Sequence, residues 1–345
     1  MDDTPGISLH IREIKNIEEL NEARSEWIEL YEASSQSTPF QSPAWLINWW
    51  KYFGNDNLYT AAVYNRRILV GLAPMYIFNY RSNNENLRQL TFIGTGNTDY
   101  MDVLCRPKFE REAVRTISEF LLDTKENWDV CDFQELRQSS PLLKIKVPEM
   151  LESRIINSDV CPVAVLPGSF YDYLQSLPVS FRKNTVRARR QLWDSGTLRL
   201  ETAKKENLDE YMDWLFRLHN ASWKNRNMPG LLEESTLQNF HRDAARDLLE
   251  QGSLRLYALK HDGRIIAAVY SLIKNDRLYY YIGGFDPAFS KYSPGSVILL
   301  EINESAISEG IRKFDFLRGR ENYKYKWKTE DRNNYRLFIK KKLTE

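Results

Sequence analysis

The chain has 345 residues, of which 42% are hydrophobic and 28% charged. This is the composition of a globular protein, and it excludes a disordered segment or an integral membrane protein. The 48 basic and 47 acidic residues nearly cancel, so no global field would attract nucleic acid or an anionic membrane, and any charged recognition must be local. At this length two packed domains are expected.

Targeting and redox features are absent from the sequence pattern. The first five residues lack the basic and apolar regions of a secretory signal. The longest apolar run, residues 70–78, is less than half the roughly 20 residues needed to span a bilayer. We therefore expect a cytoplasmic protein. Cys105, Cys131 and Cys161 are odd in number and far apart, which predicts core residues and neither a disulfide framework nor a zinc site.

The first half reads as helix, helix, hairpin, strand, helix, strand. Apolar residues at helical spacing predict a helix over 17–31, and Ser42 followed by Pro43 marks the start of another. The remaining patterns predict strands at 58–65, 68–80, 87–94, 101–105 and 128–136, with a helix over 109–123.

The second half repeats that order. Helices are predicted over 169–195 and 206–226, with a third ending near Gly252, followed by an antiparallel meander of strands 253–261, 264–274 and 277–285, a helix over 295–308 and a strand over 313–317. The repeat indicates internal duplication. We predict a mixed α/β fold of two tandem domains, 1–160 and 161–345, each a mostly antiparallel sheet flanked by helices.

The junction between the last meander strand and the next helix carries the chemistry. Its loop ends in Ser293-Pro294-Gly295-Ser296. The first turn of a helix has unpaired N–H groups and the positive end of the dipole, and a glycine there lets a diphosphate approach the backbone. The same residues also fit an ordinary helix N-cap with a proline.

Four segments carry a resemblance to a known family: FRKNTVRARRQLWDSG, HNASWKNR, the DPAFSKYSPGSVILLEINESAISEG loop and helix, and KFDFLRGRENYKYKW. The first half adds PFQSPAWLINWWKYFG and TDYMDVL. Together they resemble the BioF2-like or CelD-like branch of the GNAT acetyltransferases, which is related to FemAB-type tandem proteins.

The resemblance implies two GNAT-like domains, with an acyl-CoA site in the second and no recognisable donor loop in the first. Acetyl-CoA or another acyl-CoA would serve as co-substrate, without a metal. Its pantetheine arm would lie between the strand ending at Phe285 and the strand 313–317, and its diphosphate would meet Lys291, Ser293, Gly295 and Ser296. The loop departs from the usual GNAT pattern, because it offers one glycine and a proline.

Three residues are candidates for catalysis, since an attacking amine must lose protons. His219 lies one helical turn before Trp223 and is either a base or a core histidine. Tyr323 stands where the resemblance places the acid that protonates the leaving thiolate. Asp99 lies in a polar loop and either deprotonates the acceptor or caps a turn.

Acceptor binding is expected of a further set: Tyr100, Asp102, Trp223, Asp315, Arg318 and Lys324. Asp315 and Arg318 equally fit a buried structural pair. The aromatic residues Trp45 and Trp49 are core residues or line a cleft for a sugar ring. The basic run over 182–190 is a solvated surface or an anion site for a phosphate.

The predicted reaction is acyl transfer to a small-molecule or sugar-linked amine, an amino sugar of an envelope or polysaccharide pathway by family analogy. DNA is not an expected partner, and the near-neutral charge counts against RNA. Two alternatives stay open. One is a FemAB-type transferase that takes an aminoacyl group from tRNA, and the other is a non-catalytic scaffold of a polysaccharide pathway.

Overall fold

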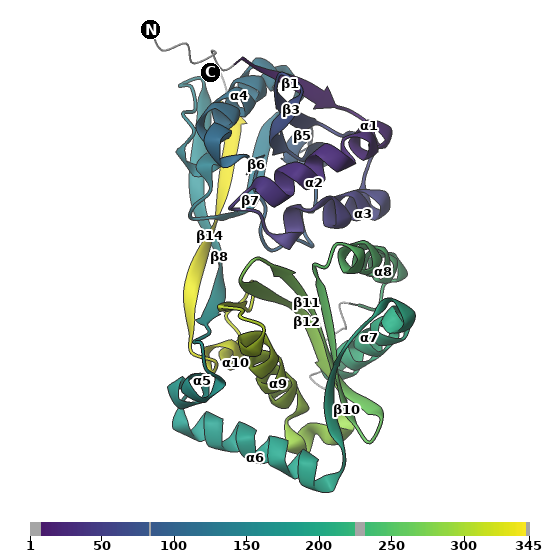
Figure 1. Cartoon of the computed structure of the whole chain (residues 1–345). Helices are drawn as coiled ribbons and strands as arrows, with labels where there is room; N and C mark the ends of the chain where they lie inside the picture. The colour runs from purple at the N-terminus through teal and green to yellow at the C-terminus, as the bar shows by residue number, and fades with distance from the viewer. Residues whose placement is uncertain (1–7, 83, 225–231, 343–345) are drawn as a thin grey trace. The chain divides into compact units, whose positions relative to one another are not determined.

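The computed structural model describes residues 8–82, 84–224 and 232–342, and the chain divides into two compact units (Figure 1). One unit is Met1–Asp159 with Asn333–Glu345, and the other is Val160–Arg332. The chain passes from the first unit to the second after Asp159, one residue from the predicted boundary. It returns to the first unit after Arg332, which was not predicted: residues 333–345 were assigned from sequence to the second domain.

The first unit contains the following elements, all within the described residues. Its helices are α1 (Ile17–Glu22), α2 (Arg24–Ala33), α3 (Pro43–Phe53) and α4 (Glu110–Asp123). Its strands are β1 (Leu9–Ile14), β2 (Thr60–Asn65), β3 (Ile68–Ala73), β4 (Met75–Ser82), β5 (Glu85–Phe92), β6 (Leu104–Cys105), β7 (Val130–Arg137), the first part of β8 (Leu151–Val165) and most of β14 (Thr329–Lys341).

Two strand groups make the sheet structure of this unit. One has the order β1-β2-β3-β6, and in the other β4 pairs with β5, β5 with β7 in parallel, and β7 with β14. Only Pro74 separates β3 from β4, because proline lacks the N–H that a central strand would use. Helix α4 covers one face through its apolar side, which includes Ala113 and Ile117.

The second unit contains the end of β8 and a meander. Its helices are α5 (Phe170–Ser176), α6 (Val179–Ser195), α7 (Leu208–Lys224), α8 (Ser235–Glu250), α9 (Pro294–Ser308) and α10 (Asn322–Tyr325), and its strands are β9 (Leu198–Thr202), β10 (Leu254–His261), β11 (Arg264–Lys274), β12 (Arg277–Phe285) and β13 (Lys313–Asp315). The strand order is β8-β13-β12-β11-β10-β9, with β12 and β13 parallel and the other pairs antiparallel.

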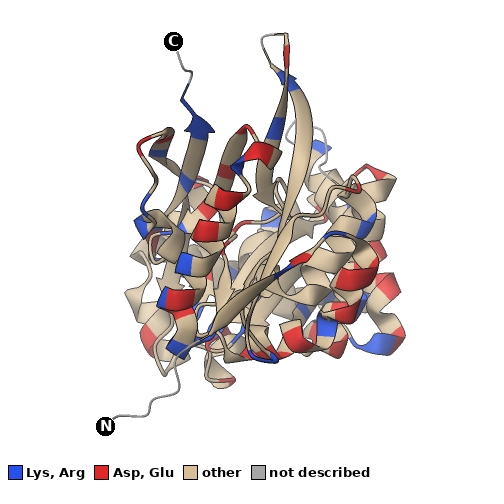
Figure 2. Cartoon of the chain, turned by 90° about the horizontal axis from the view of Figure 1, so that it is seen from above, with Lys and Arg blue, Asp and Glu red and all other residues tan. Residues whose placement is uncertain are grey.

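Both units therefore end a meander in a parallel pair, β5 with β7 and β12 with β13, each joined through a helix. This shared order confirms the predicted mixed α/β class and the repeat of one architecture in the two halves. The three cysteines are buried and free, as expected for core residues. Lys and Arg are interspersed with Asp and Glu over the helices (Figure 2). No helix in the described ranges is long and apolar enough to cross a membrane.

Several boundaries differ from the prediction for local reasons. The helix expected over 169–195 is broken before Val179, because Pro178 disfavours helical backbone in the residue before it. The strand expected over 101–105 is reduced to Leu104–Cys105. Helix α7 follows the prediction to Lys224, and residues 225–226 lie outside the described residues. Strands β1, β8, β9 and β14 were not predicted.

A buried histidine lies in the core of the second unit. The ring of His241 packs against Phe240, Tyr270 and Tyr281 at centroid distances of 4.7, 5.8 and 5.5 Å. Burial lowers the pKa of His241 from 6.5 to about 3, with a smaller contribution from His219. The imidazole is thus neutral in the folded protein at any pH near neutrality.

This burial predicts acid sensitivity. Between about pH 6.5 and 3, His241 is protonated in the unfolded state and neutral in the folded state. The free energy of unfolding therefore falls as the pH falls through that window. We expect His241→Phe to reduce this slope by about 1 kcal/mol per pH unit in urea unfolding, and His10→Asn, at an exposed histidine, to leave it unchanged. Equal slopes in both variants would contradict the assignment.

Candidate active site

The parallel pair β12–β13 separates after three residues. Register runs from Arg277 opposite Lys313 to Tyr279 opposite Asp315, and β12 then continues to Phe285 paired with β11 alone. Along this stretch a β-bulge leaves Tyr281 without a register partner on β11, and bulges re-aim the backbone of the strand that carries them. Pairing between β12 and β13 therefore ends at Tyr279, beside the stretch where the resemblance implied the pantetheine arm.

The loop after β12 leads to the start of α9. Asp286 caps a 3-10 turn by accepting a hydrogen bond from the Ala288 N–H at 3.0 Å. Ser293 adopts left-handed backbone (φ 49°), and its carbonyl accepts the N–H groups of Ser296 and Val297 at 2.9 and 3.1 Å. Pro294 occupies the first helical position, so the next N–H of this positively polarised end belongs to Gly295.

Gly295 lies against the aromatic ring of Phe285. A Cβ atom at Gly295 would be 3.3 Å from the ring, a distance that only a small shift would relieve. The structure therefore brings together the strand end and the loop that sequence reasoning connected. Lys291 extends its ammonium over the Tyr292 ring, 4.7 Å from its centroid.

Helix α7 closes on the same strand end. Its backbone passes directly over Gly284, where a Cβ atom would be 2.2 Å from the backbone nitrogen of His219. His219 Nδ1 is 3.1 Å from the Gly283 carbonyl oxygen. Ser222 Oγ accepts from the Phe285 N–H at 2.9 Å. His219 is buried, and these contacts give it a part in docking α7 onto β12.

The chain after β13 turns sharply at a buried carboxylate. Asp315 is fully buried, pairs with Arg277 at 3.2 Å and accepts the Leu317 N–H at 3.0 Å. This ion pair comes from β12, and the pairing of Asp315 with Arg318 that the sequence suggested stays a prediction. Leu317 takes left-handed backbone (φ 56°), a conformation that is costly for a leucine.

Lys324 holds this turn in place. Its ammonium donates to the carbonyls of Leu317 (3.3 Å) and Arg318 and pairs with Glu321 at 2.9 Å. The side chain is buried, so its geometry points to a structural contact. One residue earlier, Tyr323 packs edge-on against Phe316 with centroids 6.4 Å apart and is only half-buried.

The candidates from the first half lie in the loop between β5 and β6. Asp99, Tyr100 and Asp102 are all buried. The Asp99 carbonyl accepts from Asn334 at 2.9 Å, and Arg137 lies over the Tyr100 ring. Asp102 accepts from Ser140 and from the Val103 N–H, both at 2.9 Å, while burial raises its pKa to about 6.

This loop lies next to the parallel pair of its own unit. The pairing of β5 with β7 covers only Gln89 and Leu90 on β5. Beyond it, the Met101 N–H donates to the carbonyl of Glu135 on β7 at 3.1 Å. The chain thus bonds to the edge of β7 beyond the parallel pair.

Several of the predicted tryptophans and basic residues make contacts that hold the fold together. Trp45 and Trp49 are buried and donate to Thr98 (2.9 Å) and Asn97 (3.1 Å), which fixes the same loop. On α6, Arg189 is paired with Glu301 and Glu304 of α9 at 2.6 and 2.8 Å. Trp223 is half-buried, with its ring 5.5 Å from that of His219.

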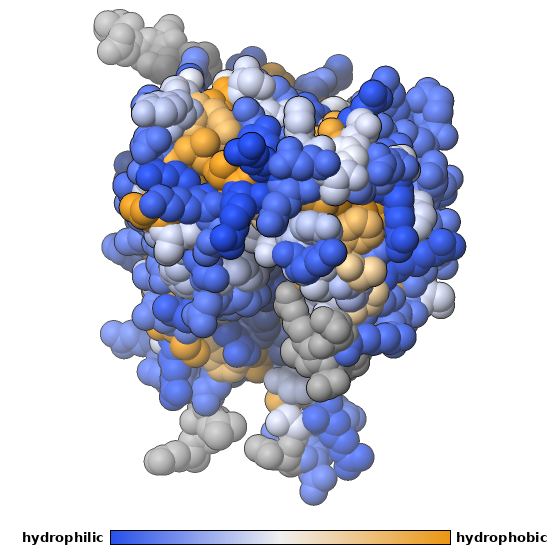
Figure 3. All heavy atoms as spheres, turned by 90° about the horizontal axis from the view of Figure 1, so that it is seen from below, coloured by the Kyte–Doolittle hydropathy of each residue, from blue (hydrophilic) through white to orange (hydrophobic). Residues whose placement is uncertain are grey.

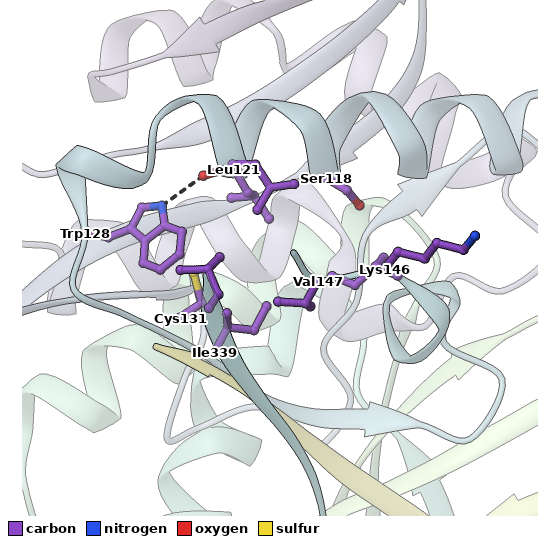
Figure 4. A pocket seen from close by; sticks show the side chains of 10 residues that line it. Ser118, Leu121, Trp128, Cys131, Lys146, Val147 and Ile339 are labelled. Carbon is purple, nitrogen blue, oxygen red and sulfur yellow. Dashed lines mark hydrogen bonds between the residues drawn. The ribbon is translucent and has the colours of Figure 1, made fainter. Parts of the chain in front are cut away.

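Two hollows in the described part of the chain lie away from this region. The first, between α4 and the sheet, is lined by Leu121, Trp128, Cys131 and Ile339 and has a volume of about 10 Å³ (Figure 4), room for about one water molecule. The second, an open hollow of about 260 Å³ beside Lys260, is lined by groups that already pair, including Lys260 with Glu201 at 2.7 Å. Neither contains a predicted site residue.

Sequence reasoning missed four contributors to the site: Arg277, Tyr281, Ser222 and Gly284. The double glycine in IGGF was an available signal, because glycine inside a strand often marks close approach of another backbone. Arg277 and Ser222 gave no signal, since their partners are 38 and 63 residues away in sequence. In the described ranges no three His, Cys, Asp or Glu side chains gather as a metal site.

Comparison with known families finds a match within the second unit. Residues 179–325 match the family model of the acetyltransferase (GNAT) domain. This stretch contains the end of the β12–β13 pairing, the α9 loop and Tyr323. A search of curated proteins finds no match to the chain.

Solved structures share the whole architecture. The crystal structure of FemX is similar over 94% of this chain and 96% of its own, with TM-score 0.66 and 10% identity. A conserved protein of unknown function from Bacteroides thetaiotaomicron VPI-5482 gives TM-score 0.59 at 12% identity, covering 96% and 100%. L-PGS from Bacillus licheniformis gives 0.54 at 12%, covering 93% and 92%. At these identities the likeness concerns the fold.

Because α7 packs closely on β12, we expect that Gly284 cannot be replaced by a larger residue without loss of stability. In Gly284→Ala the new methyl group would overlap the backbone of His219, and we expect a loss of about 2–3 kcal/mol in the free energy of unfolding, measured in urea. Gly168→Ala is the matched control, because its nearest contact would be 3.7 Å away. Equal stability of the two variants would show that α7 does not pack as described.

Proposed function

We propose that the protein is an N-acyltransferase that uses an acyl-CoA thioester at the second unit. The observation that carries the proposal is the separation of β12 from β13 next to the Phe285–Gly295 contact at the start of α9. The GNAT family match to residues 179–325 supports it.

The residues present suit such a donor. The α9 N-terminus offers N–H groups to a diphosphate, and Gly295 keeps the approach open. Lys291 adds a positive charge on the preceding turn. The bound donor would supply the activated acyl group. The bulge at Tyr281 presents backbone at the strand end, where N–H groups stabilise a developing oxyanion.

Within this proposal, Tyr323 protonates the leaving thiolate, since a phenol donates a proton without first being ionised. His219 positions α7 against β12 through its contact with the Gly283 carbonyl. The base stays unassigned among the predicted residues, with Asp99 as the sequence candidate. Asp102, whose pKa is raised to about 6, has its carboxylate engaged by Ser140.

The acceptor is proposed to be an amine on a polar small molecule, an amino sugar first, in line with the BioF2-like or CelD-like resemblance and a cytoplasmic setting. Tyr100, Trp223, Asp315 and Arg318 remain predicted contributors to acceptor binding. The tRNA-dependent alternative is tested separately, because RNA binding would weaken steeply with salt and acyl-CoA binding would not.

Tyr323→Phe tests the acid. We expect turnover with acetyl-CoA and an amino-sugar acceptor to fall about 100-fold, because a general acid is lost, while the dissociation constant of the donor stays within about twofold. Tyr325→Phe, on the same short helix with its hydroxyl bonded to Asp331, should leave turnover intact. Unchanged turnover in Tyr323→Phe would remove this residue from the mechanism.

Gly295→Leu tests the donor site. Acetyl-CoA at about 100 times its dissociation constant should stabilise the native protein by about 2.7 kcal/mol in thermal unfolding. We expect the substitution to abolish this shift by blocking the α9 N-terminus. Ser308→Leu, exposed at the other end of α9, should keep it. Absence of any shift in the unmodified protein would refute acetyl-CoA as the donor.

A further inference from the structure

Helix α6 presents three large apolar side chains to solvent. Val179, Val186 and Trp193 are 57%, 40% and 59% exposed. They are seven residues apart, so on an α-helix they fall within about 20° of one another per step and form one stripe. The helix buries a different face, through Thr185, Ala188 and Leu192.

The stripe is bordered by basic side chains. Lys183, Arg187 and Arg190 are exposed on the same outward side of α6, and Arg182 is half-buried at its border. The one acidic residue of the helix, Asp194, pairs with Arg190 at 3.6 Å. The outward face is therefore both apolar and net positive, although the whole chain carries a charge of only +1.

The helix that packs against α6 also exposes a large side chain. Helix α5 packs against α6, and its Tyr171 is 68% exposed. Figure 1 shows the two helices side by side in the second unit. Seen from below (Figure 3), the molecule shows orange apolar areas within a largely hydrophilic surface.

We propose that the α6 face docks on the surface of an anionic lipid membrane. Apolar side chains with a tryptophan, flanked by Lys and Arg on a helix lying flat, are the combination that partitions into a lipid interface. Each basic residue near an anionic leaflet strengthens binding by about fivefold. RNA would use the basic residues but has no use for Val179 and Val186, so the apolar stripe favours lipid over nucleic acid.

Flotation of the full-length protein with lipid vesicles tests the proposal. We expect binding at least about tenfold tighter to vesicles with one third phosphatidylglycerol than to phosphatidylcholine alone, and weaker binding as salt rises. No acyl donor is present, so the result is independent of the proposed activity. Equal binding to both vesicles, or none, overturns the proposal.

Two paired variants locate the surface. Lys183→Glu with Arg187→Glu should weaken binding at least about tenfold, whereas Arg67→Glu with Lys108→Glu, an equal charge change at exposed residues of the first unit, should not. The charge variant keeps the apolar contacts of α6 and should unfold at the temperature of the unmodified protein.

Val186→Ser with Trp193→Ser should also lose binding, and the exposed-residue control Ile68→Ser should retain it. If the controls lose as much as the α6 variants, the surface lies elsewhere. If the protein binds single-stranded RNA but not vesicles, and only the charge variant loses that binding, α6 is a nucleic-acid surface and the membrane proposal is wrong.

Discussion

The ion pair between Arg277 and Asp315 decides where β12 and β13 part. Asp315 is fully buried, and a buried carboxylate requires a partner and hydrogen bonds. Its ion-pair partner is Arg277 on the neighbouring strand, and its carboxylate accepts a hydrogen bond from the Leu317 N–H. The hydrogen bond from Leu317 holds the left-handed turn at that residue, and the chain leaves the sheet there. The Phe285–Gly295 contact and the position of Tyr323 both lie beyond this point.

The first unit also contains a buried aspartate beside a parallel strand pair. Its Asp132, also buried and next to the end of a parallel pair, receives the guanidinium of Arg336. In that unit the loop between β5 and β6 bonds to β7 through the Met101 N–H, and Trp45 and Trp49 hold this loop in place. Both units therefore place an arginine against a buried aspartate beside a parallel strand pair, and in the first unit the loop that contains Met101 also bonds to the strand edge. Under the proposed function, the corresponding strand end of the second unit is where the acyl donor binds.

Sequence patterns predicted the order of elements because the meander strands are bounded by turn residues, helix α4 has clear helical periodicity, and α9 is bounded by Pro294 and Gly310. They also connected Phe285 with Gly295, since a strand, a short loop and a helix must be adjacent. What they could not give is long-range pairing. The partner of Asp315 lies on β12, and β14, whose pattern is broken by charges, returns to the first unit. Nor could they show that Asp99 and Tyr100 are buried, because a polar loop is ordinarily exposed.

The return of the last strand has a consequence for how the protein is made. The core of the first unit includes Leu337 and Ile339 of β14, and Asn334 holds the loop that carries Asp99. Domains often fold during synthesis in the order in which they emerge from the ribosome. Here the unit that emerges first lacks a strand until residues 333–341 have been made, after the whole of the second unit. The sheet of the first unit is therefore unfinished while residues 160–332 are synthesised, and chaperones would meet it in that state.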